Sequence, residues 1–111
     1  MSSFRQEKIM GQIKELAARF FASESNGSSL MTITSASVSD DGKEATIFFT
    51  VLPEDKEEEA LAFTKRRRSD FKAFVKSESR LGRIPFFDFR IDVGEKNRQR
   101  IEEISSHDGQ R

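Results

Sequence analysis

The chain contains no cysteine, tryptophan or tyrosine, and its only histidine is His107. Without cysteine it can form no disulfide, no thiolate metal site and no cysteine nucleophile. Because His107 lies in the last few residues, which we expect to be a tail, neither a histidine-based triad nor a multi-histidine metal site can be assembled. We therefore expect no catalytic residue, no metal and no cofactor, and we interpret the chain as a binding protein.

Long hydrophobic runs are also missing. No apolar run approaches the about 20 residues that a membrane-spanning helix needs, and the N-terminus lacks the apolar core of a signal peptide. Together with the absence of cysteine, which fits a reducing compartment, this predicts a soluble cytoplasmic protein. A length of 111 residues, with 11 phenylalanines as bulky core material, predicts one domain, for which we take the monomer as the default.

Neither sign of charge is in excess overall, but the charges are sharply segregated. Residues 65–83 contain eight basic and two acidic residues, a net charge of +6, so the rest of this neutral chain carries −6. Residues 54–59, just upstream, hold five acidic residues and one basic residue. A basic stripe of this kind attracts polyanions, although a run of lysine and arginine is often only a solvated helix face.

The first half of the chain predicts a helix followed by two paired strands. Apolar residues recur at helical spacing from Phe4 to Ala22, and the serine-rich tract that follows ends the helix. Residues 30–39 and 43–52 have the composition of strands, and the Asp-Gly turn between them predicts an antiparallel hairpin. The alternation of the first strand changes phase, which predicts a bulge or a twist near Ser35.

The segment after the second strand predicts two helices that meet at a bend. Apolar patches at residues 60–63 and 71–75 are separated by Arg67 and Arg68, which a single straight helix would direct toward the core. A bend at this point, with Ser69 as the N-cap of the second helix, removes that conflict. The basic cluster then lies at a helix N-terminus, where free backbone N–H groups attract anions.

The last part of the chain predicts a strand and a short helix. Residues 86–93 alternate strictly between apolar and polar side chains, and Gly94 ends the strand. Residues 95–105 then form a helix, and residues 106–111 form a disordered tail. One domain therefore spans residues 1–105, and we assign its phenylalanine stripes to the core.

The order of these elements resembles that of a type II KH-like RNA-binding domain, and three segments resemble the ribosome-binding factor A family more closely. Residues 31–52 resemble the family's paired strands, and residues 80–92 resemble its Leu-Arg-x-x-Pro-x-Leu-x-Phe strand. Residues 98–104 resemble its closing Arg-Ile-x-x-Leu helix. The resemblance implies an α+β fold of order α-β-β-α-β-α, with a bent pair as the middle helix and a three-stranded sheet packed by helices.

Two segments depart from the family pattern. The family bends its helix pair at Ala-x-Gly, where this chain has Arg67-Arg68-Ser69, and this difference adds charge at the bend. The family's Asp-Pro-Arg-Leu stretch before the first strand is replaced by residues 25–29, which we expect to be looser. Such differences are typical of a divergent member.

The resemblance implies a non-catalytic small ribosomal subunit assembly factor that binds rRNA during subunit maturation and rRNA processing. Structured RNA would be held mainly through phosphate and sugar contacts. The residues that we expect to make these contacts are the basic ones at and after the bend: Arg66, Arg67, Arg68, Lys72, Lys76, Arg80 and Arg83. Six such contacts would give a slope of log K against log salt of about −4 to −5.

Two other interpretations stay open. The domain could be a protein–protein interaction module whose basic stripe docks on an acidic partner, because a KH-like scaffold does not by itself prove RNA binding. Alternatively, the acidic residues 54–59 could neutralise the basic bend within the molecule, although they lie about two helical turns from Lys65. Whether an assembly GTPase is a second partner is also open.

Overall fold

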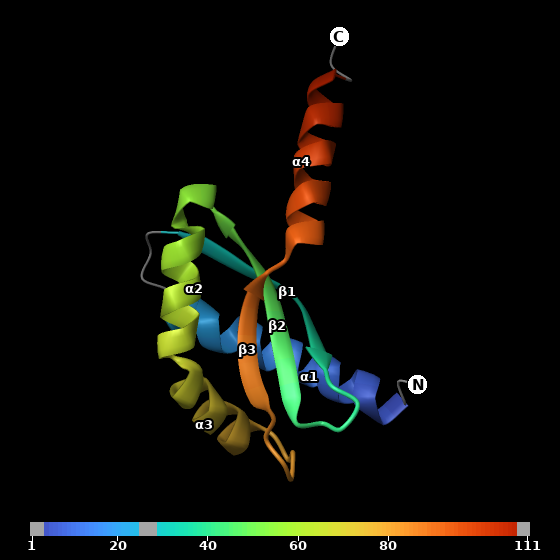
Figure 1. Ribbon diagram of the computed structural model, residues 1–111, viewed down its shortest axis with the longest axis vertical. Helices are drawn as coiled ribbons and strands as arrows, with labels where there is room; N and C mark the ends of the chain where they lie inside the picture. Colours follow the sequence, from blue (N-terminus) through green and yellow to red (C-terminus); the bar gives the residue numbers. More distant parts are fainter. Residues whose placement is uncertain (1–3, 25–28, 109–111) are drawn as a thin grey trace.

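The computed structural model describes residues 4–24 and 29–108, which form a three-stranded sheet, three helices that pack against it and a last helix that extends beyond it (Figure 1). The elements are α1 (Phe4–Glu24), β1 (Leu30–Val38), β2 (Glu44–Leu52), the 3-10 helix η1 (Glu54–Lys56), α2 (Glu57–Arg66), α3 (Arg68–Glu78), β3 (Phe86–Ile91) and α4 (Val93–Asp108). This order confirms the predicted α+β arrangement with a bent helix pair. No helix in the described part of the chain is long and apolar enough to cross a membrane.

The sheet is mixed and has β2 as its central strand. β1 runs antiparallel to β2, whereas β3 runs parallel to β2. Parallel neighbours need a long crossover, and η1, α2 and α3 supply it. The register pairs Glu44 with Phe86, so the first residues of β2 and β3 lie side by side at one edge of the domain.

The β1–β2 hairpin has the predicted turn and the predicted bulge. Gly42 adopts a positive φ of 73°, and its N–H donates to the carbonyl of Ser39 at 2.9 Å. This conformation is strained for residues with a side chain, which explains the glycine. The strand register shifts between Ile33 and Ser35, so the change of alternation in the sequence does mark a bulge.

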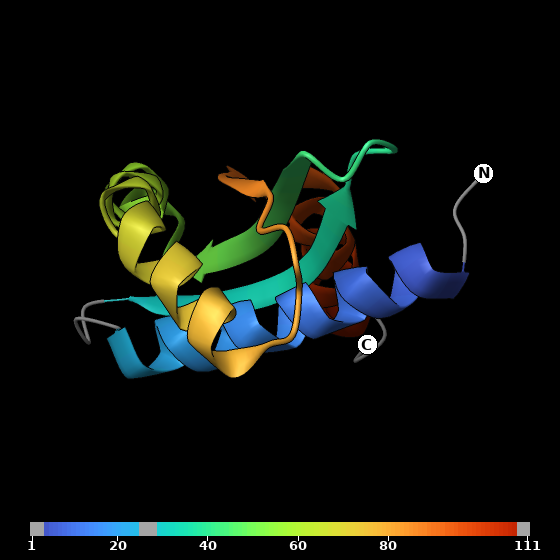
Figure 2. The ribbon, with the colours of Figure 1, turned by 90° about the horizontal axis from the view of Figure 1, so that it is seen from below.

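The core lies between the sheet and the helices α1, α2 and α3, and Figure 2 shows α1 running along this side of the sheet. Phe49 of β2 and Phe87 of β3 are at most 1% exposed. The ring of Phe71, from α3, lies 4.7 Å from that of Phe87 and 5.4 Å from that of Phe20, measured between centroids. Phe71 therefore joins α1, α3 and the sheet in one aromatic cluster.

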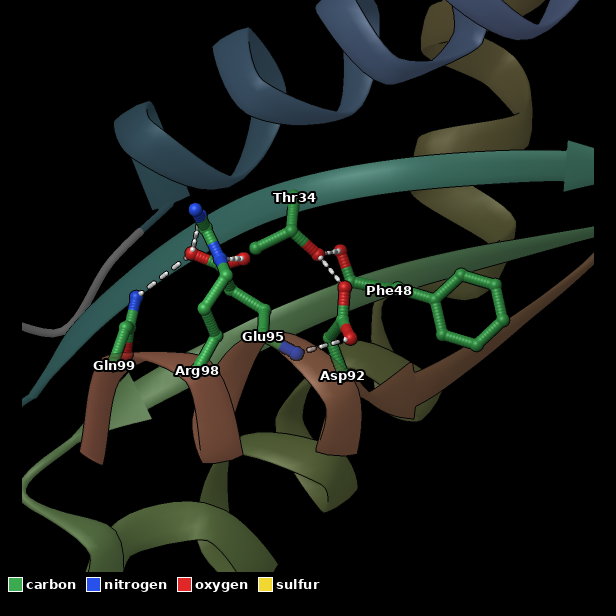
Figure 3. Close-up of polar contacts among 6 residues, drawn as sticks. All are labelled: Thr34, Phe48, Asp92, Glu95, Arg98 and Gln99. Atoms are coloured by element: carbon green, nitrogen blue, oxygen red, sulfur yellow. Dashed lines mark hydrogen bonds and ion pairs between the residues drawn. The ribbon is translucent and has the colours of Figure 1, made fainter. Parts of the chain in front are cut away.

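The start of α4 differs from the prediction. β3 ends at Ile91, and Val93 and Gly94, which we had expected at the end of the strand, are the first two residues of α4. The cause is Asp92, whose carboxylate accepts a hydrogen bond from the Glu95 N–H at 2.9 Å and so caps the helix (Figure 3). Val93 is consequently 61% exposed and takes no part in the core.

Helix boundaries differ from the prediction at two further places. α1 continues to Glu24, two residues beyond its predicted end at Ala22. α4 continues to Asp108, so it includes the first three residues of the segment predicted to be a disordered tail. The predictions for residues 25–28 and 109–111 lie outside the described residues.

α4 extends beyond the sheet, away from the other helices (Figure 1). Its first turn is attached to the crossover by Lys96, whose Nζ lies 3.0 Å from a carboxylate oxygen of Glu57 and 3.7 Å from one of Glu54. The Lys96 side chain is 26% exposed, so these ion pairs are partly shielded from water. They fix the base of α4 against the start of α2.

Candidate nucleic-acid interface

The predicted bend between α2 and α3 is present, but it is capped differently. α2 ends at Arg66, Arg67 has φ −94° and ψ 6°, and α3 begins at Arg68. Ser69, predicted as the N-cap, instead lies inside the first turn of α3. The Arg67 carbonyl accepts the Phe71 N–H at 2.9 Å, so helical hydrogen bonds continue across the bend and leave no cap position for Ser69.

The two arginines at the bend contact different elements. Arg67 turns toward α1, where its guanidinium carbon lies 6.0 Å from the ring centroid of Phe20, and it forms an ion pair with Asp70 at 2.8 Å. Its side chain is 35% exposed. Arg67 is thus engaged in packing the bend against α1, on a different side from Arg68.

Arg68 attaches the bend to the start of β3. Its Nε donates to the carbonyl of Phe87 at 2.6 Å, and Nη2 lies 3.6 Å from the Asp88 carboxylate. Its guanidinium carbon also lies 4.6 Å from the ring centroid of Phe86. These contacts hold the guanidinium in one orientation and resolve the conflict seen in the sequence, because the arginine at a core-facing position bonds to the sheet edge.

A groove of about 530 Å³ opens between the start of α3 and the edge where β2 and β3 begin. We call it the basic groove, and it is lined by Lys43, Arg68, Ser69, Lys72, Arg83, Ile84, Pro85, Phe86 and Phe87. Four of these residues are cations and none carries a carboxylate. The groove exists because β2 and β3 are parallel neighbours: the Phe86 N–H donates to the Lys43 carbonyl at 2.8 Å, which brings Lys43 beside the loop before β3.

The charge of the basic groove comes mainly from three exposed side chains, those of Lys43, Lys72 and Arg83. Within the described residues none of the three lies within ion-pair distance of a carboxylate, although Lys43 interacts electrostatically with Asp41, and Asp88 offsets part of the charge of Arg68. Unpaired cations in a concave site concentrate positive potential, because the low-dielectric walls focus the field. The arrangement can therefore bind an anion.

A second hollow of about 390 Å³ continues from the basic groove, since Arg83 and Pro85 line both. Arg5 of α1 and the β1–β2 turn also line it. The turn contributes Asp41, where a hydrogen bond from the Ser39 hydroxyl, followed by one from the Lys43 N–H, lowers the pKa of the carboxyl. The ionised carboxylate makes this hollow less attractive to anions than the basic groove.

The structure brings together three of the seven predicted contact residues. Arg68, Lys72 and Arg83 line the basic groove, and Arg67 packs toward α1 instead. The remaining three, Arg66, Lys76 and Arg80, are exposed but do not line the groove.

Lys43 lines the groove although it lies outside the basic stripe of the sequence. Its signal in the sequence is its place directly after the hairpin turn. This position places Lys43 at the groove only because β3 pairs in parallel with β2. Local sequence patterns do not specify that pairing.

The acidic segment lies away from the basic groove. Figure 1 shows η1 and the start of α2 near the base of α4, at the opposite end of the helix pair from the C-terminus of α3. Glu54 and Glu57 contact Lys96 there, and Lys56 pairs with Glu59 at 3.5 Å. The contacts of Lys96 attach α4, and the contact between Lys56 and Glu59 stays within the acidic segment. The geometry therefore favours an external partner for the groove cations over neutralisation by the acidic segment.

Comparison with known proteins points to one family. The model of the ribosome-binding factor A family matches residues 5–105. Ribosome-binding factor A of Rubrobacter xylanophilus is 31% identical over 115 residues, which cover 98% of this chain and 94% of that protein.

Solved structures show the same fold. The crystal structure of ribosome-binding factor A from Thermus thermophilus superimposes with a TM-score of 0.70 at 22% identity, covering 78% of this chain and 94% of that one. A homology model of the Thermus thermophilus protein, fitted into a cryo-EM map of its complex with the 30S subunit, gives a TM-score of 0.65 at 23% identity and covers 73% of this chain and 88% of that one. These similarities confirm the predicted KH-like type II fold.

Proposed function

Because the chain belongs to the ribosome-binding factor A family, we propose that it binds the 30S small ribosomal subunit and acts there as a non-catalytic assembly factor. The family model covers nearly the whole domain, and the Thermus thermophilus member has been fitted into a map of a 30S complex. The observation on this chain that carries the proposal is the basic groove, where Arg68 and three exposed cations that form no ion pair with any described residue surround a concave surface.

We propose rRNA as the part of the subunit that the basic groove contacts. Phosphate oxygens match the chemistry of the groove, because Lys43 and Lys72 offer ammonium groups and Arg83 offers a guanidinium that can bind a phosphate with two hydrogen bonds. Arg68 adds a fourth positive charge, and its guanidinium is fixed by the hydrogen bond to the Phe87 carbonyl. Contacts of this kind position RNA without reading its sequence, so selectivity comes from the shape of the rRNA.

Three further predicted contact residues are exposed and lie outside the groove. Arg66 lies at the end of α2, Lys76 lies one turn beyond Lys72 on α3, and Arg80 lies in the loop that leads to β3. We propose that they make weaker phosphate contacts along the same rRNA. By holding one rRNA conformation the protein would favour maturation of the subunit, as a monomer in the cytoplasm.

A salt series tests the proposal. Binding of the wild type to purified 30S subunits and to free small-subunit rRNA would be measured beside the charge-reversal variant Lys72→Glu/Arg83→Glu. Four groove contacts predict a slope of log K against log salt of about −3 to −4 for the wild type. The variant should lose most of this binding and retain the circular dichroism spectrum of the wild type, because both side chains are exposed and neither forms a hydrogen bond or ion pair with the described part of the chain.

Replacing Arg68 would be a poor test, because that residue also attaches the bend to β3. Wild-type binding that the Lys72→Glu/Arg83→Glu variant retains would place the rRNA contact elsewhere on the domain. Binding to subunits combined with no binding to rRNA would favour the groove as a docking surface for an acidic protein. Absence of binding to either would overturn the proposed function.

A further inference from the structure

Phe86 is an aromatic side chain in an unexpected place. It is 55% exposed, whereas Phe87 and Phe89 on the same strand are 1% exposed. The alternation of the strand explains why the Phe86 side chain points away from the core, because residues next to each other point to opposite faces of a sheet. It does not explain why the outward position carries a large apolar ring rather than a polar side chain.

The ring is held in place by Arg68. The guanidinium carbon lies 4.6 Å from the ring centroid of Phe86, and the guanidinium is itself fixed by its 2.6 Å hydrogen bond to the Phe87 carbonyl. A cation over a ring covers one of its two faces, and more than half of the Phe86 surface remains exposed. Packing against Arg68 therefore accounts for the orientation of the ring but leaves an open aromatic surface.

This aromatic surface borders the basic groove. Phe86 lines the groove together with Lys43, Lys72 and Arg83. A flat aromatic ring beside backbone-binding cations is the combination that binds single-stranded nucleic acid, since a base stacks on the ring while its phosphate meets the cations. The volume of about 530 Å³ is within the range of about 300–1,000 Å³ that accommodates ligands of nucleotide size.

We propose that the basic groove holds an unpaired nucleotide of RNA, with its base stacked on Phe86 and its phosphate bound by Lys43, Lys72 and Arg83. This inference rests on the proposed function, and it adds that the rRNA is single-stranded where it enters the groove. A paired base inside a duplex is already stacked on its neighbours and cannot reach the ring. Stacking is also tolerant of sequence, so little preference for one base is expected.

The test compares two RNA probes and two variants of Phe86. The probes are a short single-stranded RNA that contains 2-aminopurine, whose fluorescence is quenched by stacking, and a duplex of the same sequence. Phe86→Leu keeps an apolar side chain but removes the aromatic face, whereas Phe86→Trp keeps an aromatic face. The wild type and Phe86→Trp should bind the single strand more tightly than the duplex and should quench the 2-aminopurine.

Phe86→Leu should bind the single strand about 5-fold to 150-fold more weakly, with quenching reduced. The salt slope of this variant should be unchanged, because every cation of the groove is retained. The inference is overturned if Phe86→Leu binds and quenches like the wild type. If Phe86→Leu behaves like the wild type while Lys72→Glu/Arg83→Glu loses binding, the proposed function stands and only the stacking on Phe86 is wrong. If the wild type does not bind RNA, the proposed function and the stacking are both overturned.

Discussion

The hydroxyl of Thr34 donates a 2.6 Å hydrogen bond to the carboxylate of Asp92, and this bond joins β1 to the residue that caps α4 (Figure 3). The same hydroxyl lies 3.2 Å from the Phe48 carbonyl, but it has one proton, and the shorter contact to a charged acceptor takes it. The other carboxylate oxygen of Asp92 accepts the Glu95 N–H. Both bonds fix the direction in which α4 leaves the sheet.

Thr34→Val should destabilise the protein because it removes the hydroxyl and leaves the Asp92 carboxylate with one bond fewer. We expect the free energy of unfolding to fall by about 1–2 kcal/mol, measured by urea denaturation with circular dichroism. Thr32→Val is the matched control, since Thr32 is an exposed threonine on the same strand. An equal effect of the two substitutions would contradict a special role for the Thr34–Asp92 bond.

The stability contributed by Asp92 should depend on pH. The hydrogen bond from Thr34, followed by that from the Glu95 N–H, lowers the pKa of Asp92 in the folded state. A carboxyl whose pKa is lower in the folded than in the unfolded state contributes stability above its unfolded pKa, and this contribution is lost as the pH falls through the folded value. Stability should therefore decrease below about pH 4.

An NMR titration of the Asp92 carboxyl measures this effect directly. The midpoint of the wild type should lie below the value of about 3.9 found in unstructured peptides, and it should move upward in Thr34→Val. Correspondingly, the acid-induced loss of stability should be smaller in the variant. If the substitution leaves the midpoint unchanged, the hydrogen bond from Thr34 does not lower the pKa of Asp92.

Arg68→Lys should destabilise the fold although it retains the positive charge. Lysine has no atom equivalent to Nε and no guanidinium, so the 2.6 Å bond to the Phe87 carbonyl and the guanidinium contact with the Phe86 ring are both lost. We expect a decrease of about 1–3 kcal/mol in the free energy of unfolding. Arg66→Lys, at an exposed neighbouring position, should change it by less than about 0.5 kcal/mol, and comparable losses would refute a structural role specific to Arg68.

Phe71→Ala should be the most damaging of these substitutions. Its fully buried ring contacts those of Phe20, Phe21 and Phe87, so truncation leaves a cavity where α1, α3 and the sheet meet. A loss of about 3–5 kcal/mol is expected from thermal or urea unfolding. Phe74→Ala, on the same helix but only half-buried, should cost less; the reverse order would contradict the placement of the core.

The elements that local patterns specify were predictable. Gly42 marked the hairpin turn, and the change of alternation near Ser35 marked the bulge. The start of α4 was not predictable from alternation, because Val93 continues the apolar series of the strand. What ends the strand is Asp92, which caps α4 and binds Thr34, a residue 58 positions earlier in the chain. Contacts at that separation are decided by the folded arrangement.

In the candidate site, too, local sequence patterns predicted some residues, whereas others depend on contacts between distant parts of the chain. The run of charge alone indicated Arg68, Lys72 and Arg83 as members of a basic surface. Lys43 and Phe86 could not be added, because their proximity follows from the parallel pairing of β2 and β3. The charge run also could not show that Arg67 turns toward α1, since this depends on how the bend packs.

We propose that the basic groove, rather than the overall positive charge of the surface, binds the 30S subunit. The most direct measurement is the affinity for 30S subunits of Lys72→Gln/Arg83→Gln beside Lys8→Gln/Lys14→Gln, which removes two exposed cations of α1 that do not line the groove. The groove variant should bind more weakly, with a salt slope smaller in magnitude by about 1.5, while the α1 variant should match the wild type. Equal weakening by both variants would show that general surface charge, and not the groove, binds the subunit.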